Sequence, residues 1–84
     1  MISAAQLKAG RALLGIDQRQ LAERSGLSVP TIQRMEASEG VIRGNVDSLM
    51  KLVRALDAAG IELIGDSAVS SGGGRGVRLK RQPA

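Results

Sequence analysis

Apolar residues recur every three or four positions over most of this chain, the spacing that lines them along one side of a helix. Four such stretches predict helices at 3–14, 18–25, 29–36 and 45–59. After Gly60 the pattern changes to two short runs, Ile61–Ile64 and Val77–Lys80, which are typical of strands. The sequence therefore predicts a mainly α fold with four helices over 1–60. Strands, a Gly/Ser-rich linker and a basic tail follow over 61–84.

The second and third predicted helices are short and are separated by a tight turn. Asp17 can cap the first of them, and Gly26 supplies the left-handed residue that usually follows a helix. Ser28 caps the next helix, and Pro30 lies in its first turn, where a missing N–H costs nothing. The residues of this helix that turn inward are Ile32, Met35 and Glu36. A second helix held at a steep angle after a glycine-containing turn is a helix-turn-helix unit, whose exposed N-terminal half fits the DNA major groove.

The same stretch resembles the Cro/C1-repressor type of helix-turn-helix protein, the Xre family. The resemblance extends from about Leu7 to Leu56 and rests on a run of capping, turn and core residues. These are Gln18, Leu21, Ala22, Ser25, Gly26, Leu27, Ser28, Thr31, Ile32, Met35 and Glu36. It implies a four-helix, lambda-repressor-like domain and a sequence-specific regulator of transcription that binds double-stranded DNA. Our leading hypothesis is a repressor that occupies a palindromic operator as a homodimer. A plain helical hairpin would explain the apolar spacing alone.

The composition narrows the class of protein further. The chain has no Phe, Tyr, Trp, Cys or His. Without Cys and His, a zinc finger, a disulfide framework and the usual hydrolytic sites cannot be assembled. We therefore expect no enzymatic activity, no metal and no cofactor. Proteins that bind single strands or RNA usually stack bases on aromatic rings, so duplex DNA is the better partner and an RNA chaperone is disfavoured.

The net charge of +4 comes from one end of the chain. Arg75, Arg78, Lys80 and Arg81 have no acidic neighbour in the sequence, and the remaining residues carry equal numbers of basic and acidic side chains. Attraction to DNA must therefore depend on local placement of basic residues. No apolar run approaches the roughly 20 residues of a membrane-spanning helix, so we expect a cytoplasmic protein.

Candidate base contacts lie on the outward side of the third helix, at Val29, Pro30, Gln33 and Arg34. Glutamine can bind adenine through two hydrogen bonds, and arginine can bind guanine O6 and N7. Val29 and Pro30 could touch a thymine methyl group. The resemblance places Val29, Pro30 and Gln33 at base-facing positions, whereas Arg34 could reach either a base or a phosphate.

Candidate phosphate contacts are Gln18, Ser28, Thr31 and Arg43. Gln18 offers its side chain and the free N–H groups at the start of the second helix. Ser28 and Thr31 offer hydroxyl groups at the start of the third. The resemblance implies that the loop after this helix, with Arg43, touches the DNA backbone.

The resemblance also implies an ion pair between Arg11 of the first helix and Glu36, which closes the third. A solvated Arg11 is the alternative. In the following loop, Gly40 fits the glycine that the family commonly has there. Val41 and Ile42 replace its usual basic segment. They either enter the core, which we favour, or stay exposed as an apolar contact.

The C-terminal part is predicted to form a dimer interface. The fourth helix carries a wide apolar stripe that includes Val46 and Met50, more than three short helices can cover. The two strands must pair, within one chain or between two subunits, and Glu62 is available to Arg78 or Lys80. We favour a sheet shared between subunits, because an isolated two-stranded hairpin is marginal in water. The expected interface residues are Leu52, Leu56, Ile61, Leu63, Ile64, Val77 and Leu79.

One alternative belongs to another functional class. Small antitoxins can share this helical domain, and their main partner is a toxin protein. The strand-containing basic tail would then be the arm that binds the partner. The two hypotheses are compatible, because such antitoxins also bind DNA.

Overall fold

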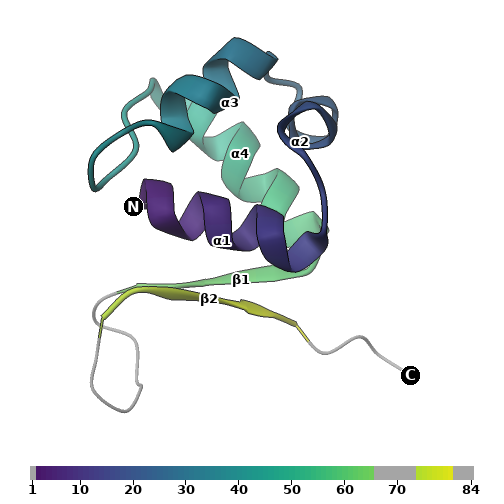
Figure 1. The fold of residues 1–84 in the computed structure, drawn as a ribbon, viewed down its shortest axis with the longest axis vertical. Coiled ribbons are helices and arrows are strands. Elements are labelled where there is room, and N and C mark those ends of the chain that lie inside the picture. Colours follow the sequence, from purple (N-terminus) through teal and green to yellow (C-terminus); the bar gives the residue numbers. More distant parts are fainter. Residues whose placement is uncertain (1, 66–73, 81–84) are drawn as a thin grey trace.

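Four helices lie on one side of a two-stranded hairpin in the computed structural model, which describes residues 2–65 and 74–80 (Figure 1). The helices are α1 (Ala4–Leu14), α2 (Gln18–Ser25), α3 (Val29–Glu36) and α4 (Val46–Ala58), and the strands are β1 (Ile61–Ile64) and β2 (Gly76–Leu79). The predicted fold class is confirmed. The expected linker over 66–74, apart from Gly74, and the tail over 81–84 lie outside the described residues.

Each helix begins at a polar side chain that accepts a hydrogen bond from the backbone. The caps are Ser3, Asp17, Ser28 and Asn45. At α2 the arrangement is reciprocal: Asp17 accepts from the N–H of Gln20 at 2.8 Å, and the Gln20 side chain accepts from the N–H of Asp17 at 2.9 Å. α1 and α2 end at Gly15 and Gly26, whose φ angles of 66° and 75° favour glycine. These caps and glycines set the helix ends locally.

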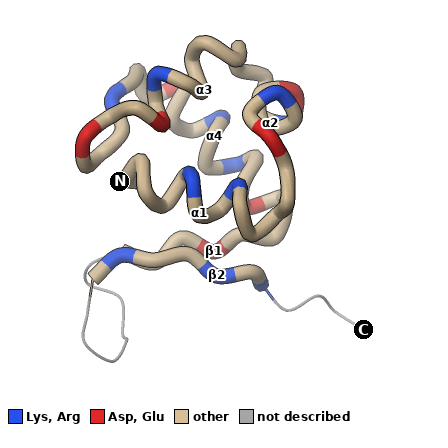
Figure 2. Tube along the Cα trace, viewed as in Figure 1, with Lys and Arg blue, Asp and Glu red and all other residues tan. Residues whose placement is uncertain are grey.

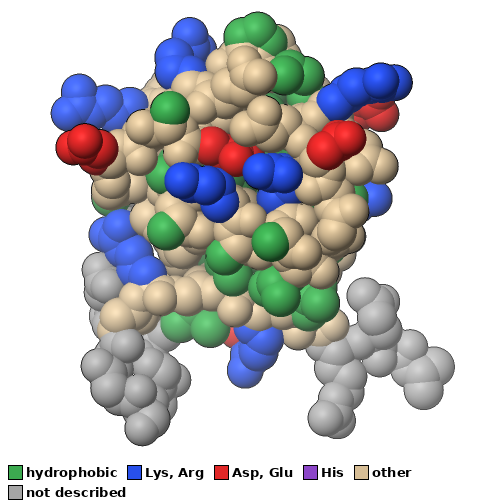
Figure 3. Space-filling view, viewed as in Figure 1, with side chains coloured by type: hydrophobic (Ala, Val, Ile, Leu, Met, Phe, Trp, Pro, Cys, Tyr) green, Lys and Arg blue, Asp and Glu red, His purple; other side chains and the backbone are tan. Residues whose placement is uncertain are grey.

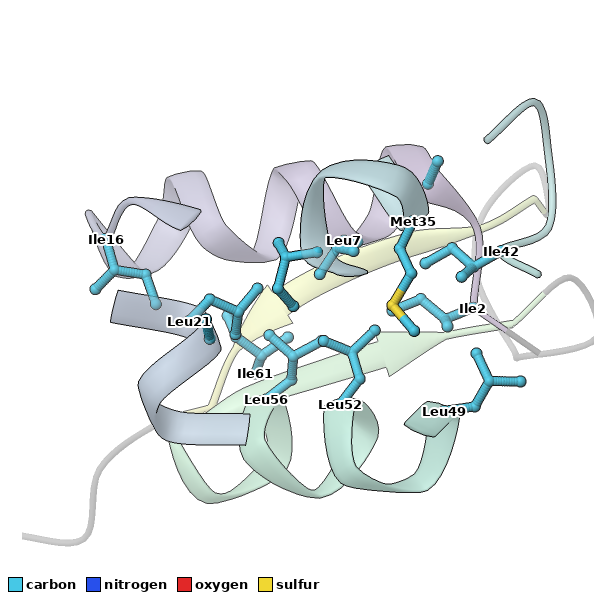
Figure 4. Packing of buried hydrophobic residues seen from close by; sticks show 13 residues of the cluster. Ile2, Leu7, Ile16, Leu21, Met35, Ile42, Leu49, Leu52, Leu56 and Ile61 are labelled. Atoms are coloured by element: carbon cyan, nitrogen blue, oxygen red, sulfur yellow. The ribbon is translucent and has the colours of Figure 1, made fainter. Parts of the chain in front are cut away.

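One apolar core forms where the four helices meet β1 (Figure 4). Its most deeply buried side chains are less than 2% exposed: Leu7, Leu21, Ile32, Met35, Leu52, Leu56 and Ile61. The core is entirely aliphatic and thioether, so its cohesion comes from many small dispersion contacts. Because Ile61 is the first residue of β1, the hairpin begins inside the core of the helical body.

The two strands pair with each other inside one chain. They are antiparallel, with Ile61 opposite Leu79 and Ile64 opposite Gly76. The expectation of a sheet shared between subunits is therefore wrong for this pairing. An isolated pair of strands is only marginally stable in water, but this hairpin is stabilised because it packs against α1 and α4 (Figure 1).

The basic residues of β2 and its end find acidic partners in the fold. Arg78 pairs with Glu62 on the neighbouring strand at 2.5 Å, and Lys80 pairs with Asp57 at the end of α4. The Lys80 N–H also donates to the carbonyl oxygen of Gly60 at 2.7 Å. The charges of Arg78 and Lys80 are thus balanced by acidic residues distant in the sequence.

Burial corrects part of the expected dimer interface. Leu52 and Leu56 are 0% exposed and Ile61 is 1% exposed within a single chain. These three side chains have no surface left for a second subunit to cover. Leu63, Ile64 and Val77 are half-buried, and Leu79 is exposed. Of the seven residues expected at the interface, these four keep accessible surface in a single chain.

The outer part of the apolar stripe on α4 stays at the surface. Val46 is 74% exposed and Met50 39%, whereas Leu49, Leu52 and Leu56 are buried. Spacing alone predicts the stripe, but the fold buries only part of it in the common core. In the described part of the chain, no helix is long and apolar enough to cross a membrane.

Candidate nucleic-acid interface

α3 is anchored by one side and open on the other. Ile32, Met35 and Glu36 are buried, as their helical spacing predicted. At 100° per residue, Pro30 and Arg34 lie opposite the centre of this buried side, with Gln33 beside them. All three of these outward residues are exposed. They form the most accessible part of the helix.

Val29 occupies a less open position than expected. It is half-buried and packs against the hydrophobic core at the start of α3. Pro30, the next residue, is exposed in the first turn, where Pro is compatible with helix geometry. Of the two candidate contacts for a thymine methyl group, Pro30 therefore presents more surface.

The hydroxyl groups at the start of α3 are engaged with each other. Ser28 Oγ accepts from the N–H of Thr31 at 3.2 Å and lies 2.9 Å from Thr31 Oγ1. Arg34 Nη2 approaches Thr31 Oγ1 at 3.5 Å, one turn along the helix. Ser28 thus caps the helix, and the Thr31 hydroxyl lies between it and the Arg34 guanidinium.

An ion pair joins α1 to the end of α3. Arg11 Nε lies 2.8 Å from Glu36 Oε2, and Arg11 Nη2 donates to Glu36 Oε1 at 3.0 Å. Arg11 Nη1 also donates to the carbonyl oxygen of Ile16 at 3.2 Å. The Glu36 side chain is 6% exposed and that of Arg11 is 25% exposed. The two-point contact therefore holds α3 from its buried end.

Gln18 extends this ion pair to α2. Its Nε2 donates to Glu36 Oε1 at 3.2 Å, so the side chain expected to bind phosphate also faces the protein. The sequence reasoning missed this bond. The sequence signal was only the place of Gln18 at the start of the second helix; the direction of its side chain towards Glu36 comes from the structure. Its backbone N–H remains at the free N-terminal end of α2.

The surroundings of Glu36 favour its charged form. Burial by itself raises the pKa of this carboxyl group. The hydrogen bonds from Arg11 and Gln18, with the positive charges of Arg11 and Lys8, outweigh burial and place the pKa below its ordinary value. The hydrogen bond to Glu36 likewise raises the pKa of Arg11. Both groups stay ionised at neutral pH.

The loop after α3 contains two adjacent apolar residues, one buried and one exposed. Ile42 is 3% exposed, which fits the expectation that it enters the core, whereas Val41 is 40% exposed and does not. Gly40 has a φ of 71°, the left-handed conformation that favours glycine. Arg43, the candidate phosphate contact, is exposed directly after the buried Ile42.

Charge is distributed around the molecule rather than gathered in one field. Basic and acidic residues are interspersed over α2, α3 and α4, whereas α1 carries basic residues only (Figure 2). The same mixture appears on the surface seen in Figure 3. Attraction to a phosphate backbone must therefore come from single basic residues held in defined places, such as Arg34 and Arg43.

Two short helices joined through a left-handed glycine, with the second anchored on one side and open on the other, define a helix-turn-helix DNA-binding domain. A family model described as helix-turn-helix matches residues 7–63. The chain belongs to this family, the Xre and Cro/C1 type of DNA-binding regulator. The family is a regulatory one and not a family of enzymes. Comparison with curated proteins gives no match.

Proposed function

We propose that this protein is a cytoplasmic repressor that binds a palindromic operator in double-stranded DNA as a homodimer. The observation that supports it most is the exposure of Pro30, Gln33 and Arg34 on a helix whose opposite side is held by core residues and the Arg11–Glu36 pair. A rod held in this way can enter the major groove without reorganising.

Base reading is assigned to Arg34 and Gln33. Arg34 lies opposite the buried side of α3, and its guanidinium matches the O6 and N7 acceptors of guanine. Gln33, beside it, can donate to and accept from adenine. Pro30 offers an apolar contact to a thymine methyl group. Val29 contributes the smaller, exposed part of its side chain.

Backbone binding is assigned to the start of α2, the start of α3 and the loop after α3. The side chain of Gln18 and the N–H groups at the start of α2 suit a phosphate oxygen, because the helix dipole favours negative charge there. Ser28 and Thr31 add hydroxyl groups, and Arg43 adds a positive charge in the loop that follows α3. These contacts set the register of the protein on the duplex and carry no sequence information.

The homodimer places two recognition helices about 34–36 Å apart on successive turns of DNA. We assign its interface to the hairpin side, where Leu79 is 47% exposed on β2 and Leu13 is 44% exposed on α1. Hydrophobic side chains gather on this lower part of the surface in Figure 3. Leu63, Ile64 and Val77 contribute their remaining accessible area.

Selection of binding sites from a pool of random duplexes tests the proposal without knowledge of the regulated gene. The expected product is a palindromic consensus with half-sites one helical turn apart. Footprinting on the DNA upstream of the protein's own gene should then protect such a site. Enrichment of no sequence would contradict specific binding. A monomer that associates only with a second protein would favour the antitoxin alternative.

A further inference from the structure

A buried glutamine in the first turn of α1 joins three segments that are far apart in the sequence. Gln6 is 5% exposed. Its Oε1 accepts from the N–H of Ser3 at 2.9 Å. Its Nε2 donates to the carbonyl oxygens of Ile64 at 2.9 Å and Gly76 at 3.0 Å. Ile64 and Gly76 face each other across the hairpin, so one amide group grips both strands.

The residues just before Gln6 hold the loop that follows α3. The N–H of Ala4 donates to the carbonyl oxygen of Gly40 at 2.9 Å, and the N–H of Ile42 donates to that of Ile2 at 3.1 Å. Ser3 and Val41 form an antiparallel bridge between these bonds. Figure 1 shows this loop, the start of α1 and the near end of the hairpin on the same side of the molecule.

Helix capping explains only part of this arrangement. Ser3 and Gln6 form a capping box, in which the Ser3 hydroxyl accepts from the N–H of Gln6 at 3.1 Å and Gln6 Oε1 accepts in return. Glutamate completes such a box as well as glutamine does. The two bonds from Nε2 to the hairpin require an amide. They are the feature of Gln6 that capping leaves unexplained.

We propose that Gln6 is a positioning residue for DNA binding, which makes the C-terminal hairpin a support of the loop that presents Arg43. The hairpin holds Gln6, and through it residues 2–4. These residues hold Gly40–Ile42 by backbone hydrogen bonds, and Arg43 follows directly. When the hydrogen bonds from Gln6 to the hairpin are lost, the loop samples more conformations. Arg43 then contacts a phosphate less often. Only this last step rests on the proposed function.

Two substitutions separate the roles of Gln6. Gln6→Glu keeps the acceptor for the Ser3 N–H but has no N–H group for the strand carbonyl oxygens. Gln6→Met keeps much of the side-chain volume and has neither donor nor acceptor. Ser3→Ala is the matched control, because it removes the capping hydroxyl and leaves both bonds from Gln6 to the hairpin. All three are made in the full chain and compared at equal fractions folded.

The first measurement is amide hydrogen exchange without DNA. In Gln6→Glu and Gln6→Met, exchange at Ala4, Ile42 and Lys80 should accelerate by about five- to thirtyfold, the effect of losing one or two net hydrogen bonds. Amides in the middle of α4 should change less. Ser3→Ala should leave Ile42 and Lys80 near the wild-type rate. Faster exchange at Lys80 with unchanged exchange at Ile42 would overturn the coupling, as would no change at Lys80 in either variant.

The second measurement is binding to a mixed-sequence DNA duplex at several salt concentrations. Losing one phosphate contact lowers the slope of log affinity against log salt by about 1. Both Gln6 variants should show part of this reduction, and Arg43→Ala should show all of it without a change in exchange at Lys80. An unchanged slope beside accelerated exchange at Ile42 would overturn the link to Arg43. A failure of wild-type protein to bind DNA would contradict the proposed function and leave the exchange result to decide the coupling.

Discussion

Arg11 Nε and Glu36 Oε2 lie 2.8 Å apart, and this contact joins the first helix to the last residue of the recognition helix. The pair is bidentate, and Glu36 has a third partner in Gln18. A buried pair of this kind contributes little to stability relative to apolar residues of the same volume, but removal of one partner leaves an uncompensated charge. We expect its main effect to be on the orientation of α3 relative to α1.

The first prediction concerns the strength of this pair. Arg11→Leu or Glu36→Leu alone should lower the free energy of unfolding, by less than the about 3–5 kcal/mol of a fully buried pair, because Arg11 is 25% exposed. The double substitution should restore much of the loss. Urea denaturation of all four proteins forms the cycle. Strictly additive losses would mean that the two side chains do not interact.

The second prediction concerns pH. The pKa of Glu36 is lower in the folded protein than its ordinary value. The unfolded chain therefore takes up the proton first, near the ordinary glutamate pKa of about 4.3. The stabilisation by Glu36 should be complete above that value and be lost as pH falls through the lower folded pKa. Glu36→Gln should have a flatter stability profile across this acidic range. Parallel profiles for wild type and Glu36→Gln would contradict it.

The third prediction concerns base reading. Arg34→Ala and Gln33→Ala should each cost about 1–3 kcal/mol on the selected operator and relax the preference at one base pair. Neither should weaken binding to random duplex as strongly. Fluorescence anisotropy with the operator and its single-base variants measures this. Equal losses on operator and random DNA for both variants would place the reading surface elsewhere.

The fourth prediction separates the two roles of Gln18. Gln18→Ala should weaken binding to all duplexes to a similar extent, because it removes a phosphate contact. It should also lower stability by about 1.5–3 kcal/mol, as expected for a hydrogen bond to a charged group. Arg43→Ala is the control that should share the first effect without the second. A sequence-dependent loss for Gln18→Ala would assign it to base contact.

The fifth prediction concerns the dimer. Leu79→Lys should convert the protein to a monomer in light scattering and weaken operator binding, while its helical content stays unchanged. The side chain is 47% exposed, so lysine can be accommodated in the monomer. Val46→Lys, at a 74% exposed position on α4, is the control that should leave the mass unchanged. A dimer that persists in Leu79→Lys would exclude the hairpin side as the interface. Cutting the chain after Gly60 is a poorer test, because it removes Ile61 from the core.

The sequence by itself determined the helices, their ends and the helix-turn-helix unit. Asp17, Gly26 and Ser28 act on backbone groups within a few residues, so their effect needs no tertiary context. Helical spacing also identified the inward side of α3, because burial of Ile32 and Met35 repeats with the helix. The Xre-type resemblance, and with it the pairing of Arg11 with Glu36, could be read from residues in fixed places along the chain.

Only the tertiary structure decided which surfaces remain after the chain has folded. Spacing showed that α4 is apolar over a wide arc, yet it could not tell that the fold buries Leu52 and Leu56 in the core and leaves Val46 outside. The bonds of Gln6 to Ile64 and Gly76 join residues 58 and 70 positions apart, a separation over which no local pattern operates. Contacts of this kind depend on how the elements pack, because each group's partner is set by three-dimensional proximity rather than by position along the chain.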